Sequence, residues 1–111
     1  MDLKEKRHFF DSMDCLVSKT TQWFDDKGLI NPDNMRAQHA KMTEEVQEVG
    51  EEVEKNDKDA LDLEIGDVIV TCIGLAAQNG SSARKCLSLA YNKIKKRTGI
   101  VENGTFIKDA P

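Results

Sequence analysis

Two short acidic motifs carry the residues of this chain that could do chemistry. They are Glu44-Glu45-x-x-Glu48 and Glu64-x-x-Asp67. On a helix, side chains three residues apart lie on one face, about 5–6 Å from each other, so each motif presents two carboxylates, Glu45 with Glu48 and Glu64 with Asp67. Two such helices side by side would gather four carboxylates around a small space. Because so many anions need a cation between them, and hard oxygen ligands suit Mg²⁺ or Mn²⁺, the motifs predict a divalent-metal site.

The helical pattern turns one carboxylate of each motif toward the predicted core. Glu45 lies three residues after Met42, and Glu64 lies three residues after Leu61, so both stand at the edge of an apolar stripe. A carboxylate in that position costs on the order of several kcal/mol unless it is paired or bound to a metal. Acidic runs are more often solvated helix faces, and this is our interpretation of the neighbouring residues Glu44, Glu51, Glu52 and Glu54.

Helices must position these motifs, and the apolar periodicity predicts an all-α protein with four of them. The predicted helices span residues 3–24, 33–55, 58–78 and 82–98. The connection at Asn56–Asp59 is short, so the second and third helices are predicted to be antiparallel neighbours. One helical hairpin cannot enclose both its own apolar stripe and a metal site. We therefore expect a four-helix bundle that is completed by homo-oligomerisation.

The length of the chain predicts one domain covering residues 1–111. It divides into an N-terminal helix (1–30), a helical core (33–98) and a C-terminal tail (99–111). Gly99 ends the last predicted helix, and the tail is expected to be extended, with a turn at Asn103-Gly104.

Composition and charge exclude several classes of protein. Charged residues make up 32% of the chain and aromatic residues 5%, and the net charge of −4 argues against a surface for a nucleic-acid polymer. No apolar run approaches the about 20 residues of a membrane span, and the first residues lack the apolar core of a signal peptide. Three cysteines have neither metal-ligand nor redox spacing, so we expect reduced core residues in a cytoplasmic protein: Cys15, Cys72 and Cys86.

The end of the fourth predicted helix is strongly basic although the chain as a whole is acidic. Lys93 and Arg97 are four residues apart, so the predicted helix would place them on one face. A cation cluster set against a carboxylate–metal cluster is what a polyphosphate substrate needs, because the metal and the cations neutralise different phosphate oxygens. The sequence contains no glycine-rich phosphate loop of the P-loop kind.

Taken together, these motifs resemble a known family. The two acidic motifs are separated by 15 residues and are followed by Asn92-Lys93-x-x-x-Arg97-x-Gly99 and by Gly104-x-Phe106-x-Lys108. This order is similar to that of the MazG-like branch of the all-α nucleoside triphosphate pyrophosphohydrolases. The resemblance covers approximately residues 38–108.

The resemblance implies a Mg²⁺-dependent enzyme, with Mn²⁺ as a possible substitute, that hydrolyses (d)NTP to (d)NMP and pyrophosphate. It also implies a homodimer or homotetramer whose partner is the nucleotide. The implied metal ligands and catalytic residues are Glu45, Glu48, Glu64 and Asp67. Lys93 and Arg97 would hold the phosphates, and the nearby substrate-binding residues would include Lys41, Asn92 and Trp23.

Other interpretations remain open at this point. A non-catalytic acidic helical interaction protein would explain the composition and the amphipathic helices, but not the inward-facing Glu45 and Glu64. A phosphoribosyl-ATP pyrophosphatase-like enzyme would share the metal chemistry without an obvious counterpart of the Gly104-x-Phe106-x-Lys108 tail. Trp23, the only tryptophan, either caps the core or lines a nucleotide pocket.

Overall fold

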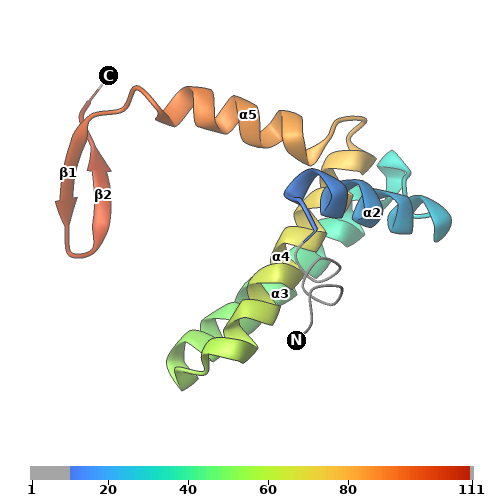
Figure 1. Ribbon diagram of the computed structural model, residues 1–111, viewed down its shortest axis with the longest axis horizontal. Helices are drawn as coiled ribbons and strands as arrows, with labels where there is room; N and C mark the ends of the chain where they lie inside the picture. Colours follow the sequence, from blue (N-terminus) through green and yellow to red (C-terminus); the bar gives the residue numbers. More distant parts are fainter. Residues whose placement is uncertain (1–10, 111) are drawn as a thin grey trace.

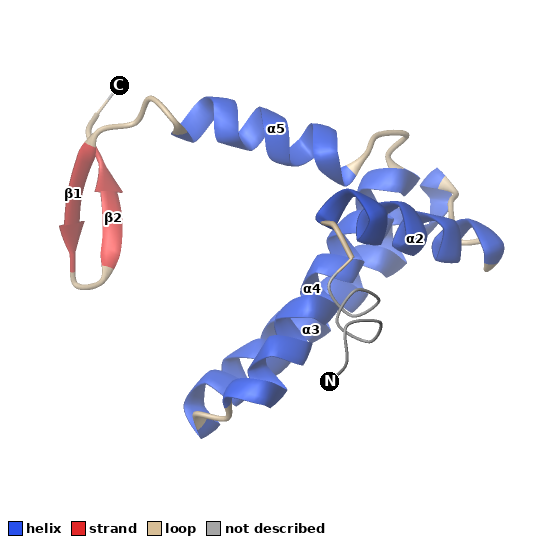
Figure 2. Ribbon diagram, viewed as in Figure 1, coloured by secondary structure: helices blue, strands red, loops and turns tan. Residues whose placement is uncertain are grey.

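The computed structural model describes residues 11–110, so residues 3–10 of the first predicted helix lie outside the described part. Four α-helices and one antiparallel hairpin make up the described chain (Figure 1, Figure 2), which confirms a mostly helical protein and adds a small sheet. The elements are α2 (Met13–Asp26), the 3₁₀ turn η1 (Pro32–Asn34), α3 (Met35–Lys55), α4 (Lys58–Gln78), α5 (Ala83–Ile94), β1 (Gly99–Glu102) and β2 (Thr105–Lys108). None of the described helices is long and apolar enough to cross a membrane.

α3 and α4 lie side by side as an antiparallel pair, as their short connection predicts (Figure 1). Asn56 ends α3 in the left-handed conformation, with φ of 56°, and the Asp57 side chain caps α4 by accepting from the backbone N–H of Ala60 at 3.2 Å. Gln38 donates from Nε2 to the carbonyl oxygen of Thr71 at 3.2 Å. This bond ties the first turns of α3 to the C-terminal half of α4.

α2 packs on α4 through the ring of Phe24, which is only 3% exposed. The ring lies against Gly74, where an added Cβ would come within 2.3 Å of it. Glycine is therefore required here for the close approach of the two helices. Within residues 11–110 the other buried apolar side chains are Ile73 and Ala76.

α4 is apolar on more sides than its neighbours cover. Residues 68–77 read VIVTCIGLAA, and a helix that is apolar all round is typically buried all round. In the described chain, however, Leu63, Ile65, Ile69 and Val70 are exposed. Two predicted core cysteines, Cys72 on α4 and Cys86 on α5, are also exposed within residues 11–110, so the prediction that they are core residues is wrong for this part of the chain. The single chain thus leaves much of its apolar surface uncovered.

α5 is shorter than the sequence predicts, because it ends at Ile94 rather than near Thr98. The hairpin that follows explains the early end: Gly99 pairs with Lys108, and Thr98 donates from Oγ1 to the Asp109 carboxylate at 2.6 Å. Both contacts hold the chain extended from Thr98 onward. Lys93 and Arg97 therefore do not share a helical face as predicted, since Arg97 lies beyond the helix.

The hairpin turn is formed by Asn103 and Gly104, with φ of 51° and 76°. Two consecutive positive φ values are the signature of a type I′ turn, whose twist matches that of the flanking strands. This confirms the predicted turn.

α5 and the hairpin extend away from the α3–α4 pair, with the hairpin at the far end (Figure 1). We call residues 83–108 the arm. The radius of gyration is 16.7 Å, whereas a compact chain of this length has about 13 Å. The protein is therefore open, with one packed helical region and a projecting arm.

The contact of Gly74 with Phe24 gives the first prediction. Gly74→Ala should destabilise the protein by about 1–3 kcal/mol, because the new methyl displaces the buried ring. Gly50→Ala is the matched control, since Gly50 also lies within a helix but has open space where the Cβ would go. That control should be neutral or stabilising by up to about 1 kcal/mol. Urea denaturation measures both, and equal effects would contradict the packing described for Gly74.

Candidate metal centre

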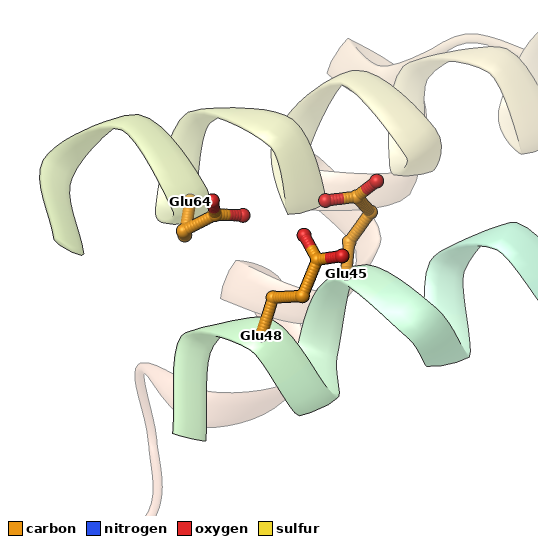
Figure 3. A group of neighbouring side chains, drawn as sticks. All are labelled: Glu45, Glu48 and Glu64. Carbon is orange, nitrogen blue, oxygen red and sulfur yellow. The ribbon is translucent and has the colours of Figure 1, made fainter. Parts of the chain in front are cut away.

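Three carboxylates converge where α3 and α4 lie against each other. Glu45 and Glu48 project from consecutive turns of α3, and Glu64 projects toward them from α4 (Figure 3). Each contributes an oxygen atom, and these atoms all lie within 4.8 Å of one another. The three residues come from both acidic motifs, which the antiparallel pairing brings to one place. We refer to Glu45, Glu48 and Glu64 as the carboxylate triad.

The burial of the triad fits a cation better than it fits solvated acid groups. Glu45 is only 7% exposed although its side chain ends in a carboxyl group. One oxygen each of Glu45 and Glu64, the Oε2 atoms, is buried without a hydrogen-bond partner within the described chain. A buried carboxylate oxygen without a partner is costly, and hard cations such as Mg²⁺ accept such oxygens as ligands. The donor set of the triad therefore fits the predicted metal.

Hydrogen bonding within the triad, followed by its negative charge, raises the pKa of its most exposed member, Glu48. Hydrogen bonding to Glu64 first, and then to Glu45, together with their negative charge, raises the pKa of Glu48 to about 7. Carboxylates so close together cannot all ionise freely, so Glu48 stays protonated up to a higher pH than an isolated glutamate does. A metal ion at the same place would replace that proton.

Lys41 supplies part of the missing positive charge. Its Nζ atom lies 3.2 Å from Glu45 Oε1 and 3.3 Å from Glu44 Oε2. These contacts, with Glu45 first and Glu44 second, raise the pKa of Lys41. The predicted substrate-binding residue Lys41 thus lies beside the triad and is paired with one of its members.

Asp67, the fourth predicted ligand, lies about one turn after Glu64 on α4 and is half-buried. It is not among the residues whose oxygen atoms lie within 4.8 Å of one another. Its place on the same helix leaves it adjacent to the triad along the α3–α4 pair. The structure thus gathers three of the four predicted ligands, and the complete ligand set remains a prediction.

The predicted phosphate-binding residues lie on the arm, away from the triad. Asn92 and Lys93 are in the last turns of α5, and Arg97 follows the helix. Asn92 accepts a hydrogen bond through Oδ1 from Lys95 at 3.0 Å. At 1.5 Å per residue, Glu64 lies about 21 Å before the C-terminal end of α4, and Lys93 lies about 15 Å after the start of α5. The two helices diverge from the point where they meet (Figure 1). One chain therefore does not bring these cations to its own triad.

Trp23 is on the outer side of α2 and is 51% exposed. Its ring packs edge-to-face on Phe24 at 5.3 Å between centroids, and Lys27 Nζ lies 5.7 Å from its centroid. It lines a hollow of about 380 Å³ together with Val70, one turn after Asp67 on α4. Trp23 thus faces an open hollow that it shares with Val70, about one helical turn from Asp67 along α4.

The structure adds two cations that the motifs did not single out as site residues. Lys96 and Lys108 line a hollow of about 340 Å³ with Arg97 at the junction of α5 and the hairpin. The pairing of Lys108 with Gly99 places it there. The turn at Asn103-Gly104 sets that register. The predicted turn is therefore the sequence signal that could have placed Lys108 beside this hollow.

A comparison with protein families found a match to this chain. The model of the MazG nucleotide pyrophosphohydrolase domain matches residues 34–101, which include α3, α4, α5 and most of β1. A comparison with curated proteins and another with solved structures found no match. The matched range contains the carboxylate triad together with Asp67, Asn92, Lys93 and Arg97, and it covers more than half of the chain.

The raised pKa of Glu48 predicts how stability changes with pH. Between pH 4.5 and about 7, folded Glu48 binds more protons than unfolded Glu48, so its contribution to stability falls as pH rises through this window. Mg²⁺ competes with that proton, so the increase in melting temperature on adding Mg²⁺ should be larger at pH 8 than at pH 5.5.

Thermal unfolding with and without Mg²⁺ at both pH values measures this difference. Glu48→Gln should remove most of the pH dependence of the Mg²⁺ effect, whereas Glu54→Gln, an exposed change on the same helix, should preserve it. A Mg²⁺ effect that is equal at the two pH values in the unmodified protein would contradict the coupling.

Proposed function

We propose that this chain, which belongs to the MazG nucleotide pyrophosphohydrolase domain family, hydrolyses nucleoside triphosphates to nucleoside monophosphates and pyrophosphate with the help of Mg²⁺. The observation that carries the proposal is the carboxylate triad. Its oxygen atoms lie within 4.8 Å of one another, and two of its oxygens are buried without a hydrogen-bond partner within residues 11–110. A family of nucleotide hydrolases and a site suited to a hard cation support the same function independently.

In this proposal Glu45, Glu48 and Glu64 hold the metal, and Asp67 completes the ligand set. Bound there, Mg²⁺ would supply electrophilic stabilisation of the phosphate oxygens. Within the described chain, Lys41 is the only cation that forms a salt bridge with a member of the triad. Once the metal neutralises Glu45 in place of Lys41, the ammonium group of Lys41 can neutralise an oxygen of the substrate.

The reaction breaks the bond between the α- and β-phosphates. A water molecule adds its oxygen to the α-phosphorus and releases a proton to solvent, while the bond from that phosphorus to the bridging oxygen breaks and pyrophosphate leaves with the bridging oxygen. Negative charge develops on the leaving group, so cations must face it in the transition state. Lys93 and Arg97 have this role in the proposal, Asn92 donates to a neighbouring oxygen, and Trp23 stacks on the base.

We further propose that the active form is a homodimer or a homotetramer. The described chain leaves large apolar side chains exposed on all its helices, among them Leu16, Val46, Leu63 and Leu87. Large apolar side chains left exposed in such number are typical of a protein that associates. A second copy would cover it.

The proposed activity predicts which products form. A panel of nucleoside triphosphates incubated with Mg²⁺ should yield pyrophosphate and no single phosphate. In ¹⁸O-labelled water the label should enter the monophosphate, because the water attacks the α-phosphorus. Label found only in pyrophosphate, or release of single phosphate, would refute this reaction. Phosphoribosyl-ATP belongs in the panel, because hydrolysis of this substrate alone would favour a phosphoribosyl-ATP pyrophosphatase-like enzyme. If no nucleotide were hydrolysed, a non-catalytic interaction protein would be favoured.

The triad predicts which carboxylates the activity requires. Glu48→Gln and Glu64→Gln should each lower kcat by at least about 100-fold, because an amide is a poor ligand for a hard cation. Glu51→Gln is the matched control, since it removes an exposed carboxylate from the same helix. Steady-state kinetics and circular dichroism would compare activity and fold. Activity that survives in either triad variant, or in excess chelator, would contradict the metal role.

A further inference from the structure

A hollow of about 380 Å³ lies where α3, α4 and α5 meet, and four sulfur-bearing side chains line it: Met35, Met42, Cys72 and Cys86. We call it the sulfur hollow. Residues 11–110 contain six sulfur-bearing side chains, three cysteines and three methionines, so most of them gather at this one place. We propose that the sulfur hollow binds Cu⁺, a soft cation, with the two thiolates as its anchoring ligands and the two thioethers beside them. The site shares no residue with the carboxylate triad and does not depend on the proposed function.

The pairing of α3 with α4 brings three of these side chains together. Met35 and Met42 are seven residues apart, which is about two turns of α3, so they lie on one face of the helix. Gln38, which lies between them in the sequence, donates to the carbonyl oxygen of Thr71 at 3.2 Å, and Thr71 directly precedes Cys72. This hydrogen bond holds Cys72 level with the two thioethers across the α3–α4 pair.

The turn between α4 and α5 brings the second thiol to the hollow. The backbone N–H of Ser81 donates to the carbonyl oxygen of Ala76 at 2.9 Å, and this bond closes the C-terminal turn of α4. Ala76 follows Cys72 by about one helical turn. The hydroxyl oxygen of Ser81 lies 3.9 Å from Cys86 Sγ, within reach of a hydrogen bond to sulfur. Ser81 can therefore donate to Cys86 once the thiol becomes a thiolate.

Both thiols are free to take a ligand. Cys72 and Cys86 form no disulfide and are exposed, whereas Met35 and Met42 are half-buried. Methionine side chains commonly fill gaps in a core, but these two border open space together with two thiols. The rest of the lining carries no carboxylate and no imidazole within the described chain: Leu75, Ala76, Asn79 and Ala83. Sulfur is therefore the only strong donor atom for a metal that the side chains of the hollow offer.

This donor set selects Cu⁺ against the other common ions. Thiolate and thioether ligands are soft and favour Cu⁺. Zn²⁺ is bound by thiolate, imidazole and carboxylate groups, so the sulfur hollow offers it an incomplete set of ligands. Mg²⁺ requires oxygen ligands, which the carboxylate triad supplies. Binding of Cu⁺ by Cys72 and Cys86 would release both thiol protons to solvent, because thiolates are the ligands, and the copper would keep its oxidation state.

A bound ion would join α5 to the rest of the helical region. α5 leaves from the C-terminal end of α4 and meets the described chain mainly through that helix (Figure 1). An ion held by Cys72 on α4 and by Cys86 on α5 would fix the angle between the two helices. Because such an ion binds only the folded arrangement, it would also stabilise the protein against unfolding.

Competition for Cu⁺ tests the site. The reduced protein is titrated anaerobically with Cu⁺ in the presence of a chelator, bicinchoninic acid, whose Cu⁺ complex absorbs visible light. It should withdraw about one ion per chain, and excess Mg²⁺ should leave that amount unchanged. Cys72→Ser and Cys86→Ser should each abolish the withdrawal. Cys15→Ser is the matched control, since Cys15 lies on α2 outside the hollow, and it should bind normally. An unmodified protein that withdraws no Cu⁺, or equal losses in all three variants, would overturn the proposal.

X-ray absorption at the copper edge identifies the ligands in the unmodified protein. The Cu⁺-loaded protein should show a first shell made of sulfur atoms alone. Replacing both thioethers, by Met35→Leu together with Met42→Leu, keeps the apolar volume and should weaken Cu⁺ binding by about 10-fold or more. Circular dichroism would confirm that this variant keeps its fold. A first shell that contains nitrogen or oxygen, or an unchanged affinity in the folded double variant, would overturn the four-sulfur site.

Discussion

The mutual repulsion of three carboxylates is the constraint around which this protein is organised. Glu45, Glu48 and Glu64 are held together by the packing of α3 on α4, with Glu45 buried and two oxygens left without a partner within the described residues. Such an arrangement is unfavourable unless a cation or a proton joins it. The raised pKa of Glu48 and the contacts of Lys41 with Glu44 and Glu45 are two partial responses to the same repulsion.

The second constraint is the small core of a single chain. Only Phe24, Ile73 and Ala76 are buried apolar side chains within residues 11–110, although α4 is apolar on most of its surface. The arm adds further exposed apolar residues instead of covering those of α4. In the proposed homo-oligomer, a second copy would cover this exposed apolar surface.

Much of this could be predicted from the sequence because local signals decide it. The bounds of α4 follow from the cap at Asp57 and the left-handed Gly80, and the meeting of the acidic motifs follows from the two-residue connection before α4. The early end of α5 could not be predicted from helical periodicity. The strand pairing of Gly99 with Lys108 competes with extension of the helix, and the spacing of apolar residues carries no information about that pairing. The direction of the arm also depends on contacts that the local sequence does not contain, so the distance of Lys93 from the triad was missed.

The most direct test of the central claim is to locate a divalent ion. Crystals soaked in Mn²⁺ give an anomalous-scattering signal at each bound ion, independent of any assay. A peak is expected between Glu45, Glu48 and Glu64, and it should disappear in Glu48→Gln crystals. Peaks confined to exposed acidic residues such as Glu51 or Glu54, with none at the triad, would contradict it.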